Sequence, residues 1–202
     1  MKKRGLLIVI SGPSGAGKGT ICKALLQKNK DLKLSVSCTT RAPREGEKEG
    51  VNYYFVSKEK FEDMIRKNEF LEYATVYGNY YGTPKSYVEE ELNKGNDVIL
   101  EIDIQGALMV KEKYPDGVFI FILPPSMEEL KNRIIKRGSE TEDSLKTRFN
   151  SAFEEIKYMS NYDYAVVNDY VEEAVKKIEC IIIAEKCRCS RVMDTVCFNQ
   201  EG

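Results

Sequence analysis

The chain has 202 residues, of which 42% are hydrophobic and 31% charged, a composition that supports one folded core. Its 31 basic and 32 acidic residues nearly cancel, so the overall charge does not favour a nucleic-acid binder. The sequence contains no histidine, which excludes His-based triads, His metal sites and imidazole acid–base catalysis. An enzyme built from this chain must rely on positioning and electrostatics, or on carboxylates, lysines, arginines or thiols.

The beginning of the chain is basic and then apolar, a pattern shared with signal peptides. The apolar run at residues 5–10 is too short, however, and Ser11-Gly12-Pro13-Ser14 follows it instead of a cleavage site. No stretch approaches the ~20 apolar residues of a membrane span. We therefore expect a buried strand here, no contact with a membrane and a cytoplasmic location.

Cysteines concentrate near the C-terminus, where Cys180, Cys187, Cys189 and Cys197 gather. These four residues could form a metal cluster, but the sequence lacks the Cys-x-x-Cys pairs that are typical of such sites. Reduced thiols in a cytoplasmic protein are the favoured interpretation.

Hydrophobic periodicity and turn residues predict the elements of the first half of the chain. In order, we expect a strand at 5–11, a helix at 20–29, a strand at 34–37, a charged loop at 41–50, an extended segment at 51–56, a helix at 57–68 and a hairpin formed by 70–76 and 80–81. Ser57 is expected to cap its helix, and Gly78-Asn79 to form the hairpin turn. Thr83 is expected to cap the next helix, with Pro84 in its first position and Gly95 at its end.

The second half alternates strands and helices. In order, we expect a strand at 97–103, a helix at 105–113, a strand at 118–123, a helix closed by 137–138, a helix at 140–159, a strand at 164–167 and a final helix. Ser126 and Glu129 form a capping box, and Asp169 followed by Glu172 is expected to cap the final helix. The apolar strands predict an α/β fold whose central parallel sheet is covered by helices on both faces.

The chain is interpreted as a single domain, 1–202, with three parts. The core comprises about 1–33, 95–125 and 160–190. The polar, tyrosine-rich segment at about 34–94 forms a small inserted subdomain of mixed β/α structure, and about 126–159 forms a helical lid. We expect the subdomain and the lid to be the parts that move.

A glycine-rich segment between the first predicted strand and helix carries the strongest signal. Its residues are Gly12, Pro13, Ser14, Gly15, Ala16, Gly17, Lys18, Gly19 and Thr20. They match the phosphate-binding pattern Gly-x-x-x-x-Gly-Lys in the context that the motif requires. Glycines let consecutive N–H groups turn around a polyphosphate, the helix N-terminus adds positive potential, and Lys18 can reach the outer phosphates. The alternative is a tight strand-to-helix turn with an incidental lysine.

One residue departs from the motif. The lysine is usually followed by Ser or Thr, whose hydroxyl contacts Mg²⁺, but here Gly19 precedes Thr20. We therefore assign no direct protein ligand, and expect Mg²⁺ to be held by phosphate oxygens and by waters near Thr20 and Asp103.

A second cluster of polar residues lies in the inserted segment. Arg41 and Arg44 flank Pro43, and this rigid spacing suits two guanidinium groups that close on one phosphate. Downstream follow Tyr53, Glu72 and the run 78–83, Gly-Asn-Tyr-Tyr-Gly-Thr. Taken singly, such tyrosines are more often packing residues, and loop arginines are usually solvated.

Together with the phosphate loop, this ordered series resembles guanylate kinase over about residues 7–191. The resemblance implies a three-layer P-loop kinase fold in which the inserted subdomain binds GMP. It also implies the reaction ATP + GMP = ADP + GDP, with Mg²⁺ accompanying ATP, as a step that recycles GMP in purine nucleotide metabolism. Acceptance of dGMP and the choice between monomer and homodimer stay open.

The resemblance also implies roles for individual residues. The implied GMP-binding residues are Arg41, Arg44, Tyr53 and Tyr81 around the phosphate, Ser37, Glu72 and Thr83 around guanine, and Asp103, which orients the arginines or metal-bound water. The implied ATP-binding residues are the glycine-rich segment 12–20 with Arg133 and Arg137. The implied catalytic residues are Lys18, Arg41, Arg137 and Arg148. The lid arginines are expected to fold over the ATP phosphates.

The chemistry of guanine agrees with a role for Glu72. Guanine presents N1–H and an exocyclic amine side by side, and one ionised carboxylate can accept both. Adenine lacks this pair, so the carboxylate would stay buried without a partner, which can lower acceptance by ~10⁴-fold or more. Glu101 and Asp103 are expected to share one face of a strand, near the strand ends where nucleotide sites form.

Two other functions are compatible with these residues. A non-catalytic module could bind a phosphorylated partner in the same cleft, although such modules typically have a degraded phosphate loop. A related kinase could instead act on a phosphorylated ribose, although Ser37, Glu72 and Thr83 argue against that acceptor.

Overall fold

The computed structural model describes residues 4–76, 78–136 and 142–193, without the side chains of 136 and 142–148. Its elements are β1 (Leu7–Ser11), α1 (Lys18–Lys28), β2 (Leu32–Leu34), β3 (Cys38–Thr39), β4 (Tyr54–Phe55), α2 (Lys58–Arg66), β5 (Phe70–Val76), β6 (Asn79–Pro84), α3 (Lys85–Asn93), β7 (Asp97–Glu101), α4 (Ile104–Lys113), β8 (Val118–Leu123), α5 (Met127–Lys136), α6 (Glu142–Ile156), the 3₁₀ helix η1 (Lys157–Asn161), β9 (Tyr164–Val167), α7 (Val171–Lys186) and α8 (Cys189–Met193).

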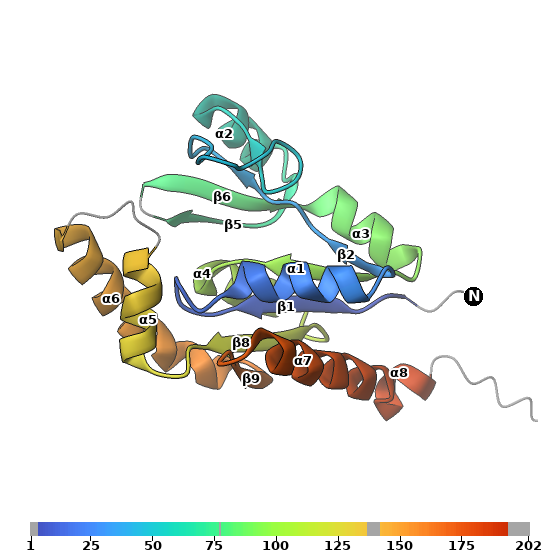
Figure 1. Cartoon of the computed structure of the whole chain (residues 1–202). Helices are drawn as coiled ribbons and strands as arrows, with labels where there is room; N and C mark the ends of the chain where they lie inside the picture. The colour runs from blue at the N-terminus through green and yellow to red at the C-terminus, as the bar shows by residue number, and fades with distance from the viewer. Residues whose placement is uncertain (1–3, 77, 137–141, 194–202) are drawn as a thin grey trace, which may run out of the picture.

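The central sheet has the order β2-β7-β1-β8-β9, and all of its neighbouring strands are parallel. Alternate residues of β1 point to opposite faces of the central sheet. Ile8 and Ile10 pack with α1 and α7, whereas Leu7 and Val9 pack with α3 and α4. Because helices cover both faces, every residue of β1 is buried. The predicted α/β fold with a central parallel sheet is confirmed (Figure 1).

A second, smaller sheet has the order β4-β3-β6-β5, with one parallel and two antiparallel pairings. Helix α2 packs on it, and Phe61 of this helix stacks on Phe70 and Tyr80 with ring centroids 4.4 and 5.3 Å apart. A register shift between Phe70 and Glu72 interrupts the alternation of β5, and residues 70–72 are all buried. This irregularity places a carboxylate inside the protein.

The link between the two sheets differs from the prediction. Of the strand expected at 34–37, only Leu34 lies in a strand, at the end of β2 in the central sheet, and β3 of the second sheet begins at Cys38. Residues 35–37 cross from one sheet to the other (Figure 1). The expectation of one strand was wrong because apolar spacing does not reveal a change of sheet.

Two expected helix caps are also absent. Thr83 lies in β6 and donates its hydroxyl to Glu72, and Pro84 occupies the N-cap position of α3. The N-cap of α7 is Tyr170, with no side-chain hydrogen bond, so the cap expected at Asp169 was wrong. By contrast, Ser57 and Ser126 accept the amide hydrogens of Lys60 and Glu129, as expected.

The lid segment contains α5 and α6, which pack through Leu130, Ile134 and Ala152. The expected closing residues 137–138 lie outside the described residues. The division of the chain into core, subdomain and lid at the expected boundaries stays a prediction.

Two expectations concern membrane helices and thiols. No helix in the described ranges has both the length and the apolar character needed to cross a membrane. In the same ranges all cysteines are free, and no cluster of three potential metal-ligating side chains occurs. Cys197, the last of the four C-terminal cysteines, lies outside the described residues.

Asp97, at the start of β7, provides a test of the core. Its carboxylate is buried, accepts the Leu6 amide at 2.9 Å and pairs with half-exposed Lys186. Asp97→Ala leaves the buried Leu6 amide without its acceptor and should lower the free energy of unfolding by about 1–3 kcal/mol. Lys186→Ala removes a half-exposed partner and leaves the carboxylate bonded to the Leu6 amide, so it should cost less than Asp97→Ala. Urea unfolding of both variants measures the difference, and equal losses would contradict this account.

Candidate active site

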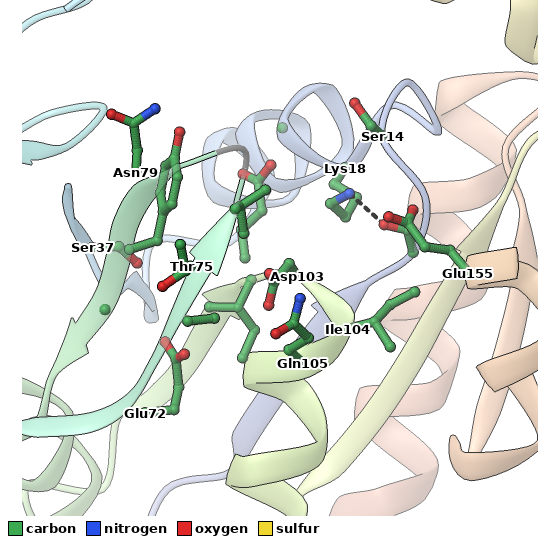
Figure 2. A pocket seen from close by; sticks show the side chains of 18 of the residues that line it. Ser14, Lys18, Ser37, Glu72, Thr75, Asn79, Asp103, Ile104, Gln105 and Glu155 are labelled. Carbon is green, nitrogen blue, oxygen red and sulfur yellow. Dashed lines mark hydrogen bonds between the residues drawn. The ribbon is translucent and has the colours of Figure 1, made fainter. Parts of the chain in front are cut away.

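A cavity of about 740 Å³ lies between the glycine-rich segment and the second sheet. Its walls include Gly12, Lys18 and Glu101, near the C-terminal ends of β1 and β7, and Ser37 and Tyr81 from the opposite side. Figure 2 shows Ser37 and Glu72 on one side of the pocket, facing Ser14 and Lys18 on the other. Parallel α/β sheets place ligand sites at this edge, so the cavity is the candidate active site.

The glycine-rich segment has the backbone that its sequence predicts. Gly12, Gly15 and Gly17 have φ values of 137°, 91° and 92°, in the region that favours glycine. Lys18 folds back over the loop and donates to the carbonyls of Gly12 and Pro13 at 2.6 and 3.1 Å. The N-cap of α1 has no side-chain hydrogen bond, so this helix end can offer amide hydrogens to an anion.

Asn168, directly after β9, supports this loop and was not predicted from the sequence. Its side-chain amide is buried and donates to the Ala16 carbonyl at 2.8 Å. A Cβ atom on Gly17 would lie 2.3 Å from Asn168 Nδ2, so the glycine is required by packing as well as by φ. Arg133 donates to the Asn168 carbonyl at 3.1 Å and pairs with Glu129. Arg133 therefore lies beside the loop, although it is not among the residues that line the cavity.

On the opposite wall, Arg41 is fixed by several partners. Its Nε donates to the Tyr81 hydroxyl at 3.1 Å, and its guanidinium lies 5.6 Å from the centre of the Tyr53 ring. Arg41, Arg44, Tyr53 and Tyr81 all line the cavity, so the structure brings the four predicted phosphate-binding residues together. Burial raises the pKa of Tyr53 to about 12, and this hydroxyl therefore remains a hydrogen-bond donor at neutral pH.

Glu47 is a second residue that was not predicted from the sequence. Its two oxygens accept from Arg41 Nη2 at 2.9 and 3.0 Å, and Oε2 also accepts the Arg44 amide at 2.8 Å. Glu47 does not line the cavity, whereas both arginines do. It therefore supports the arginine pair from behind. Its only sequence signal is an acidic residue three positions after Arg44, within a loop rich in charge.

Glu72 is the most deeply buried carboxylate of the cavity, with 3% of its surface exposed. The Thr83 hydroxyl donates to its Oε1 at 2.6 Å, and a Cβ atom on Gly106 would lie only 2.5 Å from its Oε2. Burial, reinforced by the negative charge of Asp103, raises the pKa of Glu72 to about 7. Ser37 lines the cavity with Glu72, whereas Thr83 lies behind the carboxylate and is not part of the lining.

Glu101 and Asp103 both line the cavity, but they do not share a strand face as expected. Strand β7 ends at Glu101, and Asp103 is the N-cap of α4, accepting the Gly106 amide at 2.8 Å. Burial raises the pKa of Asp103. A polar residue that follows a strand is often a helix cap, as Asp103 is here.

Helix α6, in the expected lid segment, contributes to the cavity in a way the sequence did not reveal. Glu155 of α6 lines the cavity, beside Lys18 (Figure 2). Burial raises the pKa of Glu155, while the Lys18 charge lowers it. Arg137 lies outside the described residues, as does the side chain of Arg148. Thr20 is exposed and is not part of the lining.

Comparison with known proteins agrees with this geometry. The family model described as guanylate kinase matches residues 4–185. The guanylate kinase of Clostridium tetani (strain Massachusetts / E88) is 69% identical over 200 residues, covering 99% of this chain and 96% of its own. That of Halalkalibacterium halodurans is 55% identical over 193 residues, covering 96% and 95%.

A solved structure gives the same result. The crystal structure of guanylate kinase from Anaplasma phagocytophilum superposes with a TM-score of 0.80 at 38% identity, over 95% of this chain and 91% of that one. Agreement over nearly the full length, in sequence and in fold, shows that this chain belongs to the guanylate kinase family.

Proposed function

We propose that this chain transfers the γ-phosphoryl group of ATP to GMP, giving ADP and GDP. The observation that carries the proposal is one cavity with two unlike anion-binding walls: a glycine-rich loop with Lys18, and an arginine–tyrosine cluster beside a buried carboxylate. The names and high identity of its relatives support the same reaction. ATP and GMP are therefore its proposed substrates.

The donor half of the site consists of the loop 12–20. Its inward-turned amide hydrogens and the α1 N-terminus bind the ATP phosphates, and Lys18 reaches the outer ones when it leaves the carbonyls of Gly12 and Pro13. Arg133 lies beside this loop and is proposed as a further ATP contact, with Arg137.

The acceptor half consists of two groups of residues. Arg41, Arg44, Tyr53 and Tyr81 bind the GMP phosphate, because two guanidinium groups and two hydroxyls converge there. Glu72 accepts the N1–H and the amine of guanine, Thr83 holds that carboxylate in place, and Ser37 adds a hydroxyl beside it. Asp103 completes this end of the cavity.

The residues also fit a divalent cation, for which we propose Mg²⁺. Carboxylate oxygens at Glu101 and Asp103 face a cavity that binds phosphates, and Mg²⁺ typically takes one or two carboxylates with substrate phosphates and waters. When bound with ATP, Mg²⁺ neutralises phosphate charge. We propose that waters near Thr20 and Asp103 take part in holding it.

Catalysis in this site rests on positioning and charge. Phosphoryl transfer passes through a loose transition state whose charge spreads over the phosphoryl oxygens, and Lys18 and Arg41, with the proposed lid residues Arg137 and Arg148, stabilise that charge. The acceptor is already a phosphate oxyanion, so the reaction needs no strong general base. A chain without histidine is therefore sufficient for this chemistry. Closure of the lid and subdomain is proposed to exclude water and so limit hydrolysis of ATP.

We also propose a cytoplasmic enzyme that acts without nucleic acid, as a monomer or a homodimer. Free thiols at Cys22, Cys38, Cys180, Cys187 and Cys189 support a reducing compartment.

A panel of acceptors with MgATP tests the reaction. Release of ADP should be fast with GMP, and slow with AMP or a ribose phosphate, because neither offers the pair of donors that Glu72 accepts. Lys18→Ala should lower kcat by about 100-fold or more while the fold is retained. Lys23→Ala, an exposed lysine on the same helix, is the matched control. Inert GMP, or equal rates in the Lys18 and Lys23 variants, would refute the proposal.

The raised pKa of Glu72 predicts a pH dependence. Guanine needs the ionised carboxylate, so kcat/KM for GMP should rise as the pH increases through about 7, the pKa of Glu72 in the free enzyme. Below that value it should fall about tenfold per pH unit. Glu72→Gln removes the titrating group while keeping the shape of the side chain. Its profile should be low and lack this step, so that any titration left belongs to the GMP phosphate. Identical pH profiles of kcat/KM in the unaltered and Glu72→Gln enzymes would rule out Glu72 as the group whose ionisation controls guanine binding.

The Glu47–Arg41 pair predicts a split between KM and kcat. Glu47→Ala releases Arg41 and the Arg44 amide and should raise the KM for GMP by about tenfold, equivalent to about 1.4 kcal/mol, with a smaller effect on kcat and none on the KM for ATP. Glu47→Gln keeps hydrogen-bond acceptors and should recover part of the loss. Glu45→Ala, which changes an exposed carboxylate of the same loop, is the control. A Glu47→Ala enzyme with the GMP KM of this control would contradict the assignment.

A further inference from the structure

Strand β5 contains one residue more than its partner strand, directly before the buried carboxylate of Glu72. In the antiparallel pairing with β6, Phe70 lies opposite Pro84. Glu72 lies opposite Thr83, one position out of step, so Leu71 is the extra residue of a β-bulge. A bulge leaves its extra residue unpaired in the ladder, and Leu71 is buried. Its carbonyl therefore needs a hydrogen-bond donor from elsewhere in the protein.

Lys113, the last residue of helix α4, supplies that donor. Its Nζ donates to the Leu71 carbonyl oxygen at 2.8 Å. Strand β5 is the last strand of the second sheet, and α4 packs along it (Figure 1). The lysine therefore provides, from a helix, the hydrogen bond that a regular ladder would provide.

The same face of α4 also holds the carboxylate that follows the bulge. Gly106, Val110 and Lys113 recur at helical spacing, so they lie on one side of α4. A Cβ atom on Gly106 would lie only 2.5 Å from Glu72 Oε2, and Val110 belongs to the same apolar cluster as Leu71. Successive turns of α4 thus lie against two successive residues of β5, which restricts the direction in which Glu72 points.

Lys113 also brings charge to this carboxylate. The groups that face Glu72 are the hydroxyl and amide of Thr83 from β6, and Asp103 and Lys113 from the two ends of α4. Burial and the negative charge of Asp103 raise the pKa of Glu72, whereas the hydrogen bonds from Thr83 and the positive charge of Lys113 lower it. Lys113 is the cation of this set, so it favours the ionised carboxylate that is proposed to accept guanine.

We propose that Lys113 is a positioning residue for base recognition: it holds the β5 bulge through the Leu71 carbonyl, and so directs the Glu72 carboxylate into the cavity in its charged form. This inference rests on the proposed function, because it concerns the residue that reads the base in that site. Lys113 is not part of the cavity lining, whereas Glu72 is. The lysine therefore acts through Glu72 and not by contact with a substrate.

Substitutions at Lys113 separate this role from a general loss of stability. Lys113→Met removes the donor and the charge, and should raise the KM for GMP by about tenfold, with a smaller effect on kcat and none on the KM for ATP. The midpoint of the pH profile of kcat/KM for GMP should move to higher pH, because loss of the positive charge raises the pKa of Glu72. Lys113→Arg keeps the donor and the charge and should restore most of both properties. Lys176→Met, which removes an exposed lysine of α7, is the matched control.

A second variant keeps the test decisive if Lys113→Met does not fold. Lys113→Gln keeps an N–H donor and removes the charge, so it should give the shift to higher pH with a smaller rise in the KM for GMP. Urea unfolding measures how much stability each variant retains. The same substitution in a Glu72→Gln enzyme shows whether Lys113 acts through the carboxylate, because there it should lower kcat/KM for GMP by less than about twofold.

Three results would overturn the proposal. They are Lys113 variants with the GMP KM and the pH midpoint of the Lys176→Met control, an equal rise in the KM for ATP and for GMP, and a Lys113→Gln effect that is undiminished in the Glu72→Gln enzyme. A failure of the proposed function would be seen separately, as absence of GMP phosphorylation by the unaltered enzyme and by the control. In that case the dissociation constant of GMP, measured by calorimetry on the same variants, takes the place of KM.

Discussion

The parallel pairing of β1 with β7 is the constraint on which the site depends. In this register Ile10 lies beside Glu101, so the glycine-rich loop and the carboxylates after β7 emerge at the same edge of the sheet. The pairing is stabilised by strands that are buried on both faces, and a shift by one residue would turn Ile8 and Ile10 toward the opposite layer of helices. Burial of apolar side chains therefore fixes the position of the glycine-rich loop relative to the carboxylates at the end of β7.

The charged side chains of the cavity differ in how deeply they are buried. The cations Lys18, Arg41 and Arg44 line walls where phosphates are proposed to lie, and hydrogen bonds to Tyr81 and Glu47 orient the Arg41 side chain. Glu72 is buried among partners that restrict it to one position. Such preorganisation substitutes for acid–base chemistry in a chain without histidine, because the electrostatic work of orienting the groups is done during folding.

The sequence was sufficient to predict an element where a local pattern and the chemistry of its residues agree. The loop 12–20 combines backbone-specific glycines with a lysine, and the strands 118–123 and 164–167 are apolar throughout, so these elements were predicted with their observed bounds or close to them. The split between β2 and β3 depends on a change of partner strand, which leaves no periodic trace. The same holds for Asn168 and Glu47, single polar residues whose roles arise from contacts with segments folded beside them. Thr83 has a pattern typical of a cap, yet it lies in β6, and Pro84 takes the N-cap position of α3.

Gly106 has a consequence for how base selection could be altered. It belongs to the first turn of α4, and it leaves the space that the carboxylate of Glu72 occupies. The atoms that are proposed to face guanine are thus set by the absence of one methyl group on a helix that lies behind them. A search for kinases with a different purine preference should therefore randomise this helical turn together with Glu72. A substitution at Glu72 alone leaves the shape of the space around its side chain unchanged.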